Sequence, residues 1–348
     1  MQRTRTNGNN DMAQQIKINQ HYVPRFYLDN FADEERFCAV FDKQHRKTTR
    51  KNNKSLCSSD HYYDLPATLD AGDEALFQVI ENQLSKVEEI GQRMLQSIIK
   101  AVAGADAGLM HKPGVFKRLN GWQIRNLAGY IALQYLRTEA ARELIRREHN
   151  AIGMECVIEL AAKIDAAYDA KKVGRWSVNE NWIKWYHILS MAEFRDYFHY
   201  FERKIFVIGV NSTRKSLITS DNPVVLAPHE YDDDPRLDSY GMRLVFPISP
   251  TIALCAYEHR FWNRLSVWDG QPKLLDEDEI DLFNEMQLLS SRKKIFGKTS
   301  ADVGFAALLC DEYPNVFMFD HSGNPKSNPA ERKRLVSSLL NDYEPHLV

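Results

Sequence analysis

The chain has 348 residues and a mass of 40.3 kDa, enough for one large domain or two ordinary ones. Its formal net charge of −2 argues against a basic nucleic-acid-binding surface over the whole molecule, although it leaves room for a local basic groove. The five scattered cysteines form no CxxC pair, which argues against a zinc knuckle or disulfide framework and favours a reducing, cytoplasmic location. No run of eighteen apolar residues occurs, so no membrane span is expected.

The N-terminal part of the chain combines a polar start with short structured segments. Residues 1–15 are rich in Asn, Gln, Thr and Arg and predict a flexible tail. Pro24 favours an extended residue before it and a short helix after it, at 26–31. The apolar run at 37–42 predicts a strand, and the basic stretch that begins at Lys43 and ends at Lys54 predicts a hairpin with a solvated tip.

The middle of the chain has the apolar periodicity of helices, and the remainder has the shorter apolar runs of strands. Helices are predicted at about 73–102, 120–149, 152–170 and 181–202. Strands are predicted at 204–210, 216–219, 224–226 and 251–256, followed by a helix at 276–289. The predicted fold class is therefore α+β: a largely antiparallel sheet built from N- and C-terminal segments, with a helical insert at about 73–202, in a single domain over 16–348.

Five segments combine unusual residue types in a fixed order. They are QHYVPRFYL at 20–28, VFDK at 40–43, IALQYLRT at 131–138, ITSDNPV at 218–224 and FPISP at 246–250. In this order they resemble the bacterial domain-of-unknown-function family 4238, over roughly residues 17–296. Because the family's name states no activity, the resemblance locates candidate residues without implying a reaction.

Six polar residues of these segments form the candidate site: His21, Arg25, Gln134, Arg137, Asp221 and Asn222. His21 lies shortly before Pro24, and a histidine near such a proline also occurs in His-Asn-His nucleases, where it activates water beside a metal ion. The alternative is a histidine that only makes a local hydrogen bond while the neighbouring aromatic residues pack.

Gln134 and Arg137 are three residues apart, so they lie on one side of the predicted helix. The planar guanidinium suits an anion or phosphate contact. The alternative is an ion pair with Asp221 or Glu88, because an arginine left unpaired in an apolar environment is costly.

Asp221 and Asn222 lie in a loop between two predicted strands, a common place for catalytic or metal-binding groups. Asp221 is the candidate ligand of a divalent metal, Mg²⁺ or Mn²⁺, and the alternative for the loop is a turn that fixes the strand connection. A single carboxylate holds a metal poorly, so further carboxylates would have to join it: Asp60, Asp64, Glu81 or Glu88.

Two functional hypotheses follow. The first is a metal-dependent nuclease or other hydrolase of a phosphate-containing substrate, with His21 as base, Asp221 as metal ligand and nucleic acid bound along residues 43–54. The alternative is a non-catalytic binding or regulatory protein, associated with a mobile element or phage defence, in which the motifs secure the fold. Two or more carboxylates in a pocket beside His21 would favour the enzyme. A filled, salt-bridged core at that place would favour the binding protein.

Overall fold

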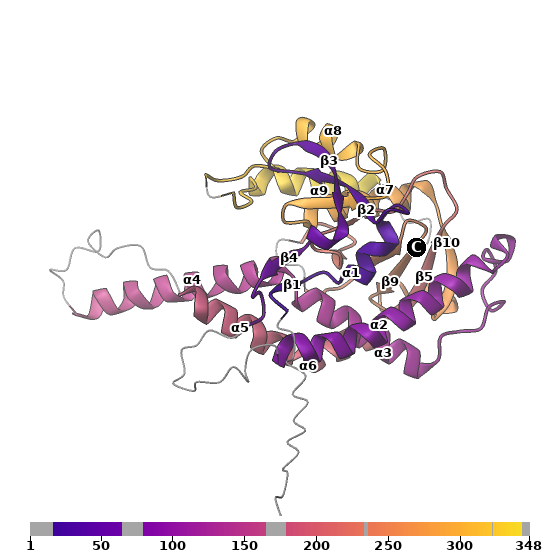
Figure 1. The fold of residues 1–348 in the computed structure, drawn as a ribbon, viewed down its shortest axis with the longest axis horizontal. Helices are drawn as coiled ribbons and strands as arrows, with labels where there is room; N and C mark the ends of the chain where they lie inside the picture. Colours follow the sequence, from indigo (N-terminus) through magenta and orange to yellow (C-terminus); the bar gives the residue numbers. More distant parts are fainter. Residues whose placement is uncertain (1–16, 65–78, 165–178, 233–235, 322, 343–348) are drawn as a thin grey trace, which may run out of the picture.

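The computed structural model describes residues 17–64, 79–164, 179–232, 236–321 and 323–342 (Figure 1). The predicted tail at 1–15 and the start of the first predicted helix, at 73–78, lie outside these residues.

Most strands belong to two sheets. The five-stranded sheet has the order β10-β5-β9-β8-β7, with β5 (Ile205–Asn211), β7 (Val225–Ala227), β8 (Arg243–Ser249), β9 (Ile252–Tyr257) and β10 (Gln271–Leu275). The four-stranded sheet has the order β3-β2-β11-β6, with β2 (Phe37–Asp42), β3 (Lys47–Asn52), β6 (Thr219–Ser220) and β11 (Lys294–Gly297). A separate antiparallel pair joins β1 (Asn19–His21) to β4 (Ser58–Asp60).

The strand pairing is antiparallel in every case except β10 with β5, among the residues that the structure describes. The predicted α+β class with antiparallel-rich sheets and a helical middle is therefore confirmed. The strands form two main sheets instead of one, and only the four-stranded sheet combines segments from the N-terminal and C-terminal parts of the chain.

Helices from the middle of the chain lie on one side of the sheets, and later helices lie on the other (Figure 1). The first group comprises α2 (Val79–Ala103), α3 (Gly121–Leu136), α4 (Glu139–Ile164), α5 (Glu180–Ala192) and α6 (Phe194–Glu202). The second group comprises α7 (Glu277–Ser290), α8 (Phe305–Glu312) and α9 (Pro329–Asp342). A single-turn helix, α1 (Arg25–Leu28), follows β1 near the N-terminus, and η1 (Asp29–Phe31) continues it.

The predicted single helix at 120–149 is wrong, because the chain breaks between α3 and α4. Arg137 caps the end of α3, and the Thr138 hydroxyl accepts a hydrogen bond from the Ala141 backbone N–H, 3.3 Å away. A threonine at this place satisfies an N–H that the first turn of a helix leaves unpaired. A new helix therefore begins at Glu139 and runs to Ile164, through most of the segment predicted as a separate helix at 152–170. Residues 165–170 of that prediction lie outside the described residues.

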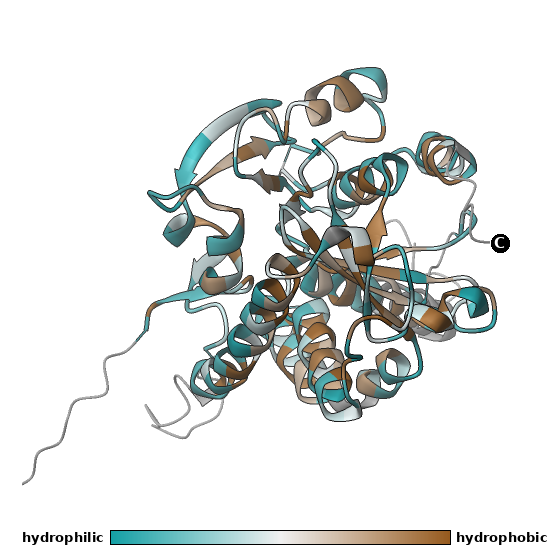
Figure 2. Ribbon diagram, turned by 90° about the vertical axis from the view of Figure 1, so that its right-hand side faces the viewer, coloured by the Kyte–Doolittle hydropathy of each residue, from teal (hydrophilic) through white to brown (hydrophobic). Residues whose placement is uncertain are grey.

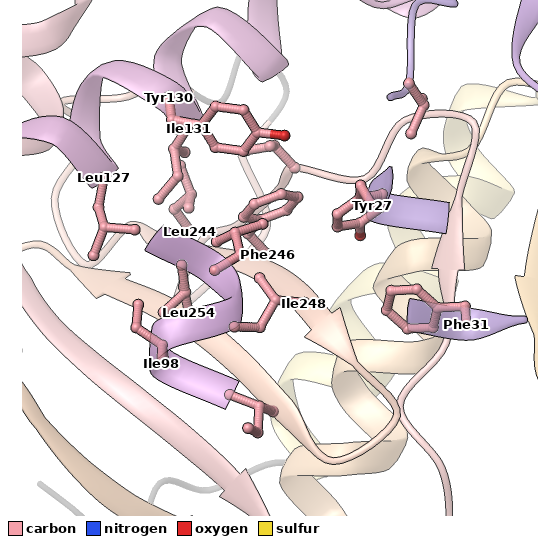
Figure 3. Close-up of a cluster of buried hydrophobic side chains, with 14 of the residues drawn as sticks. Tyr27, Phe31, Ile98, Leu127, Tyr130, Ile131, Leu244, Phe246, Ile248 and Leu254 are labelled. Carbon is pink, nitrogen blue, oxygen red and sulfur yellow. The ribbon is translucent and has the colours of Figure 1, made fainter. Parts of the chain in front are cut away.

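Hydrophobic side chains fill both faces of the five-stranded sheet. Alternate residues of a strand point to opposite faces, so Leu244 and Phe246 of β8 lie in one cluster while Val245 lies in the other. On the first face, Leu127 and Ile131 of α3 join the cluster of β8 and β9 (Figure 3). Helix α7 contributes buried side chains to the second cluster. The central strands are accordingly mostly hydrophobic in Figure 2.

Tyr27 of α1 connects the N-terminal segment to this sheet. Its ring stacks on Phe246, with centroids 5.1 Å apart and planes 9° apart. Its hydroxyl donates to the Pro247 carbonyl oxygen at 2.6 Å and accepts from Thr219 Oγ1, also at 2.6 Å. Three of the five motif segments therefore meet at one buried tyrosine.

Candidate functional site

The side chains of α3 hold the backbone of the N-terminal motif. Arg137 Nη2 donates to the His21 carbonyl oxygen at 2.6 Å, and Gln134 Nε2 donates to the Tyr22 carbonyl oxygen at 3.2 Å. The two polar residues predicted to share one helix face therefore both face the strand segment that carries His21.

Arg137 is paired with an acid and is almost fully buried. Its Nη2 lies 2.8 Å from Glu88 Oε1, and its Nε donates to the Tyr63 hydroxyl at 3.2 Å. Burial acts to lower the pKa of Arg137, but Tyr63 and Glu88 outweigh it and raise the pKa. Of the two interpretations of Arg137, the structure therefore contains the ion pair with Glu88.

The His21 side chain makes the local contact of the second interpretation. Its Nε2 lies 3.2 Å from the Lys54 carbonyl oxygen, so Nε2 carries the proton in this bond. Burial lowers the pKa of His21, and the bond to Lys54 opposes that shift. His21 is thus a half-buried imidazole, with its neutral form favoured by burial, that links β1 to the turn before β4.

The Asp221 carboxylate is occupied by backbone N–H groups. It accepts from Arg292 at 2.7 Å, Lys293 at 2.8 Å and Lys294 at 3.0 Å. Burial raises the pKa of Asp221, while the Lys43 ammonium and these three bonds oppose the shift. Asp221 therefore fixes the start of β11.

Two further motif residues hold the same connection between α7 and β11. The Lys43 ammonium donates to the carbonyl oxygens of Leu288, at 3.0 Å, and Ser291. The Asn222 amide donates to the Ser290 carbonyl oxygen at 3.1 Å. Burial lowers the pKa of Lys43 to about 8. We call Lys43, Asp221 and Asn222 the turn brace, because they satisfy backbone groups over 288–294 that lack helix or sheet partners.

Three of the four carboxylates named as additional metal ligands, those of Asp64, Glu81 and Glu88, lie in other contacts. Asp64 accepts from His61 Nδ1 at 2.6 Å and from Gln20 Nε2 at 2.7 Å, and Glu81 pairs with Lys17. Within the described ranges, no group of three His, Cys, Asp or Glu residues is placed to hold a metal ion. Asp60 is exposed at the end of β4, and Arg25 lies partly buried on α1.

The basic stretch forms the predicted hairpin, in which β2 and β3 pair antiparallel and the tip is exposed. Its charge is partly neutralised, because Arg46 pairs with Asp311 at 2.7 Å and Arg50 pairs with Asp33 at 2.6 Å. The exposed lysines of this stretch are Lys47, Lys51 and Lys54. Lys43, in contrast, is buried in the turn brace.

A pocket of about 740 Å³ lies where α3 ends and α4 begins. Thr138 and Asn222, from two motif segments, line it and face each other, with Thr138 Oγ1 3.3 Å from Asn222 Oδ1. The short side chains of Ala140 and Ala141 leave space on the α4 side. Aromatic and charged residues form much of the remaining lining: Tyr135, Tyr197, Tyr200, Glu148, His199, Arg236 and Asp238.

Sequence reasoning identified Asn222 but not the pocket. Thr138 was part of a motif, yet its neighbours across the pocket come from α6 and from the segment after residue 235. The signal that could have revealed Thr138 is its position before Glu139 within a helical pattern, which is typical of a helix N-cap.

These features define an α+β protein with a motif-braced core and a pocket beside the brace. The chain belongs to the family described as "Protein of unknown function (DUF4238)", whose model matches residues 19–301. No curated protein and no solved structure matches the chain. Among the described residues, no helix has the length and apolar character needed to cross a membrane.

Proposed function

We propose that the protein is a non-catalytic binding protein and that the pocket at the α3–α4 junction is its ligand site. The observation that carries the proposal is the meeting of Thr138 and Asn222 in that pocket. These residues are far apart in the sequence, and each belongs to a segment that resembles the family. Both residues line the pocket; Thr138 is buried and donates to Asn222, and Asn222 in turn donates to the Ser290 carbonyl oxygen.

The arrangement around His21 favours binding over hydrolysis. A hydrolytic base must reach a water molecule, and a metal needs several free carboxylate oxygens. Here His21 bonds the Lys54 carbonyl oxygen, Asp221 accepts three backbone N–H groups, and Glu88 pairs with Arg137. Such a filled, salt-bridged environment supports the binding hypothesis over the hydrolase.

A pocket of this size suits a small molecule. Ligand pockets commonly measure about 300–1,000 Å³ and combine apolar walls with a few polar groups. The lining here has that character, since Leu136, Leu144 and Ile145 lie beside Thr138 and Asn222.

The test is a small-molecule screen by saturation-transfer NMR with the full chain. The Ala141→Trp variant places an indole in the pocket, and Ala151→Trp, at an exposed position of the same helix, is the matched control. We expect ligands that bind the wild type and the control but not Ala141→Trp. A screen in which Ala141→Trp retains every ligand would contradict the proposal.

A further inference from the structure

Three tyrosines line the pocket from two helices. Tyr135 comes from the last turn of α3, and Tyr197 and Tyr200 come from α6. The faces of tyrosine rings carry partial negative charge and attract cations, by about 0.5–1 kcal/mol at exposed sites and about 2 kcal/mol when the cation is desolvated. An aromatic lining of this kind suits a flat apolar ligand or an organic cation, and the charges around it distinguish the two.

The charged side chains of the lining give the pocket a negative balance. They are two carboxylates, Glu148 and Asp238, against one guanidinium, Arg236, with His199 counted as neutral. Arg236 Nε lies 3.8 Å from Asp238 Oδ1, so these two charges largely offset each other. Glu148 makes no ion pair with any residue that the structure describes, and its charge remains.

The pKa of the Tyr197 hydroxyl reflects the same negative balance of charge. Burial raises its pKa first, and the carboxylates of Glu193 and Glu148 raise it further. The lining near Tyr197 is therefore a place where a positive charge is stabilised and a negative charge is repelled.

The partial charges at the ends of α3 and α4 do not reverse the negative charge balance of the pocket lining. The C-terminal end of α3 and the N-terminal end of α4 meet at Thr138, and their partial charges have opposite sign. The two ends therefore give the floor of the pocket little net preference for either charge, and the side chains decide it.

We propose, on the basis of the binding function above, that the pocket binds a small organic cation, a primary or quaternary ammonium compound. Its charged group lies near Glu148 and Tyr197, and its carbon skeleton lies along Leu144, Ile145 and Tyr200. A phosphate-bearing ligand fits less well, because Glu148 repels it and Arg236 is already beside Asp238.

The probes are choline and 2-phenylethylamine, each compared with an uncharged analogue, 3,3-dimethylbutan-1-ol and 2-phenylethanol respectively. Dissociation constants are measured by NMR titration of the full chain at low ionic strength. We expect at least one cation to bind about tenfold more tightly than its uncharged analogue, as a cation–π contact beside a carboxylate predicts.

Two variants locate the charge that causes this preference. Glu148→Gln keeps the shape of the side chain and should reduce the preference to about twofold or less, because only the ring contacts then distinguish charge. Glu155→Gln, at an exposed position of the same helix, is the matched control and should keep the full preference.

The outcomes separate this inference from the proposed function. If the alcohols bind as tightly as the cations and Ala141→Trp abolishes both, the pocket is a ligand site but the cation assignment is overturned. If the preference persists in Glu148→Gln, the assignment is overturned as well. If neither series nor the screen gives an Ala141→Trp-sensitive ligand, the binding function itself fails.

Discussion

The polar motif residues lie in two regions with different surroundings. In the turn brace, the charged groups of Lys43 and Asp221 lie against backbone carbonyl and N–H groups that lack helix or sheet partners. At the α3–α4 junction, Thr138 is among the residues that line the pocket, and its hydroxyl contacts the Ala141 N–H and the Asn222 side chain. The comparison shows that polar residue types alone do not define a site. In both regions other groups of the chain supply the partners of these residues, and only the α3–α4 junction has a pocket beside them among the residues that the structure describes.

Removal of the carboxylate of the turn brace should have the largest effect on stability. Asp221→Ala leaves three buried or part-buried N–H groups and the buried Lys43 ammonium without their acceptor, and we expect the free energy of unfolding to fall by roughly 3–5 kcal/mol. Asp221→Asn, which keeps one acceptor oxygen, should lose less.

Urea denaturation measures this difference, with Asp311→Ala as the control. Asp311 is 68% exposed in its ion pair with Arg46, so its loss should cost at most about 1 kcal/mol. Equal losses for Asp221→Ala and Asp311→Ala would mean that the turn brace contributes little to stability.

The buried ion pair of α3 should have the next largest effect. Arg137→Met leaves Glu88 unpaired and removes the bond to the His21 carbonyl oxygen, so unfolding should become easier by about 3 kcal/mol. Arg125→Met is the control, because Arg125 lies on the same helix in a pair that is 67% and 37% exposed. Thermal unfolding of both variants tests the prediction, which a larger loss in Arg125→Met would contradict.

Acid should weaken the fold through His187, which is fully buried between α3 and α4. Burial, with the nearby Arg142 cation, lowers the pKa of His187 from 6.5 to about 3. Below pH 6.5 the unfolded chain therefore binds a proton that the folded chain does not, and stability should fall by about 2 kcal/mol near pH 5.

Unfolding measured from pH 7 to pH 5 in His187→Gln checks this assignment. The variant is expected to be less stable at pH 7, because the contacts with Arg142 and the Leu136 carbonyl oxygen change. Its stability should nevertheless depend less on pH, whereas His111→Gln, at an exposed position, should keep the wild-type dependence. An unchanged slope in His187→Gln would assign the acid effect to other groups.

The smallest expected effect is on nucleic acid. With Mg²⁺ or Mn²⁺ present, we expect no cleavage of single-stranded DNA, double-stranded DNA or RNA, because Asp221 is occupied by backbone bonds. The opposite outcome is metal-dependent cleavage by the wild type that is lost in the folded variants His21→Ala and Asp221→Asn. It would favour the nuclease hypothesis, in which His21 is the base.

Local sequence signals predicted several elements well. The capping residues Asn120 and Asp276 begin α3 and α7 within a residue of the predicted starts, and β2 has the predicted bounds. Each of these depends on side chains a few residues apart. By contrast, β8 is absent from the predicted strands. It contains Pro247, which cannot donate to a ladder, and a proline normally argues against a central strand. The sheet accommodates it with a register irregularity between Pro247 and Ser249.

The candidate site was less predictable for a different reason. From the sequence, either Asp221 or Glu88 could be the ion-pair partner of Arg137. The packing of α2 beside α3 places Glu88 next to Arg137. The pocket depends on the break at Thr138 and on α6, so its shape arises from how separate helices pack. The hydrophobic periodicity of one helix predicts its buried face but not which other helices pack beside it.

The order of the four-stranded sheet has a consequence for synthesis of the chain. Strand β2 lies between its hairpin partner β3 and β11, so that Phe41 pairs with Ile295. During translation the hairpin emerges early, but one edge of β2 keeps its hydrogen-bonding groups unpaired until residues 294–297 have left the ribosome. An exposed strand edge is a template for pairing with other chains. Nascent chains that stop before β11 should therefore be the form of this protein most prone to aggregate and most dependent on chaperones.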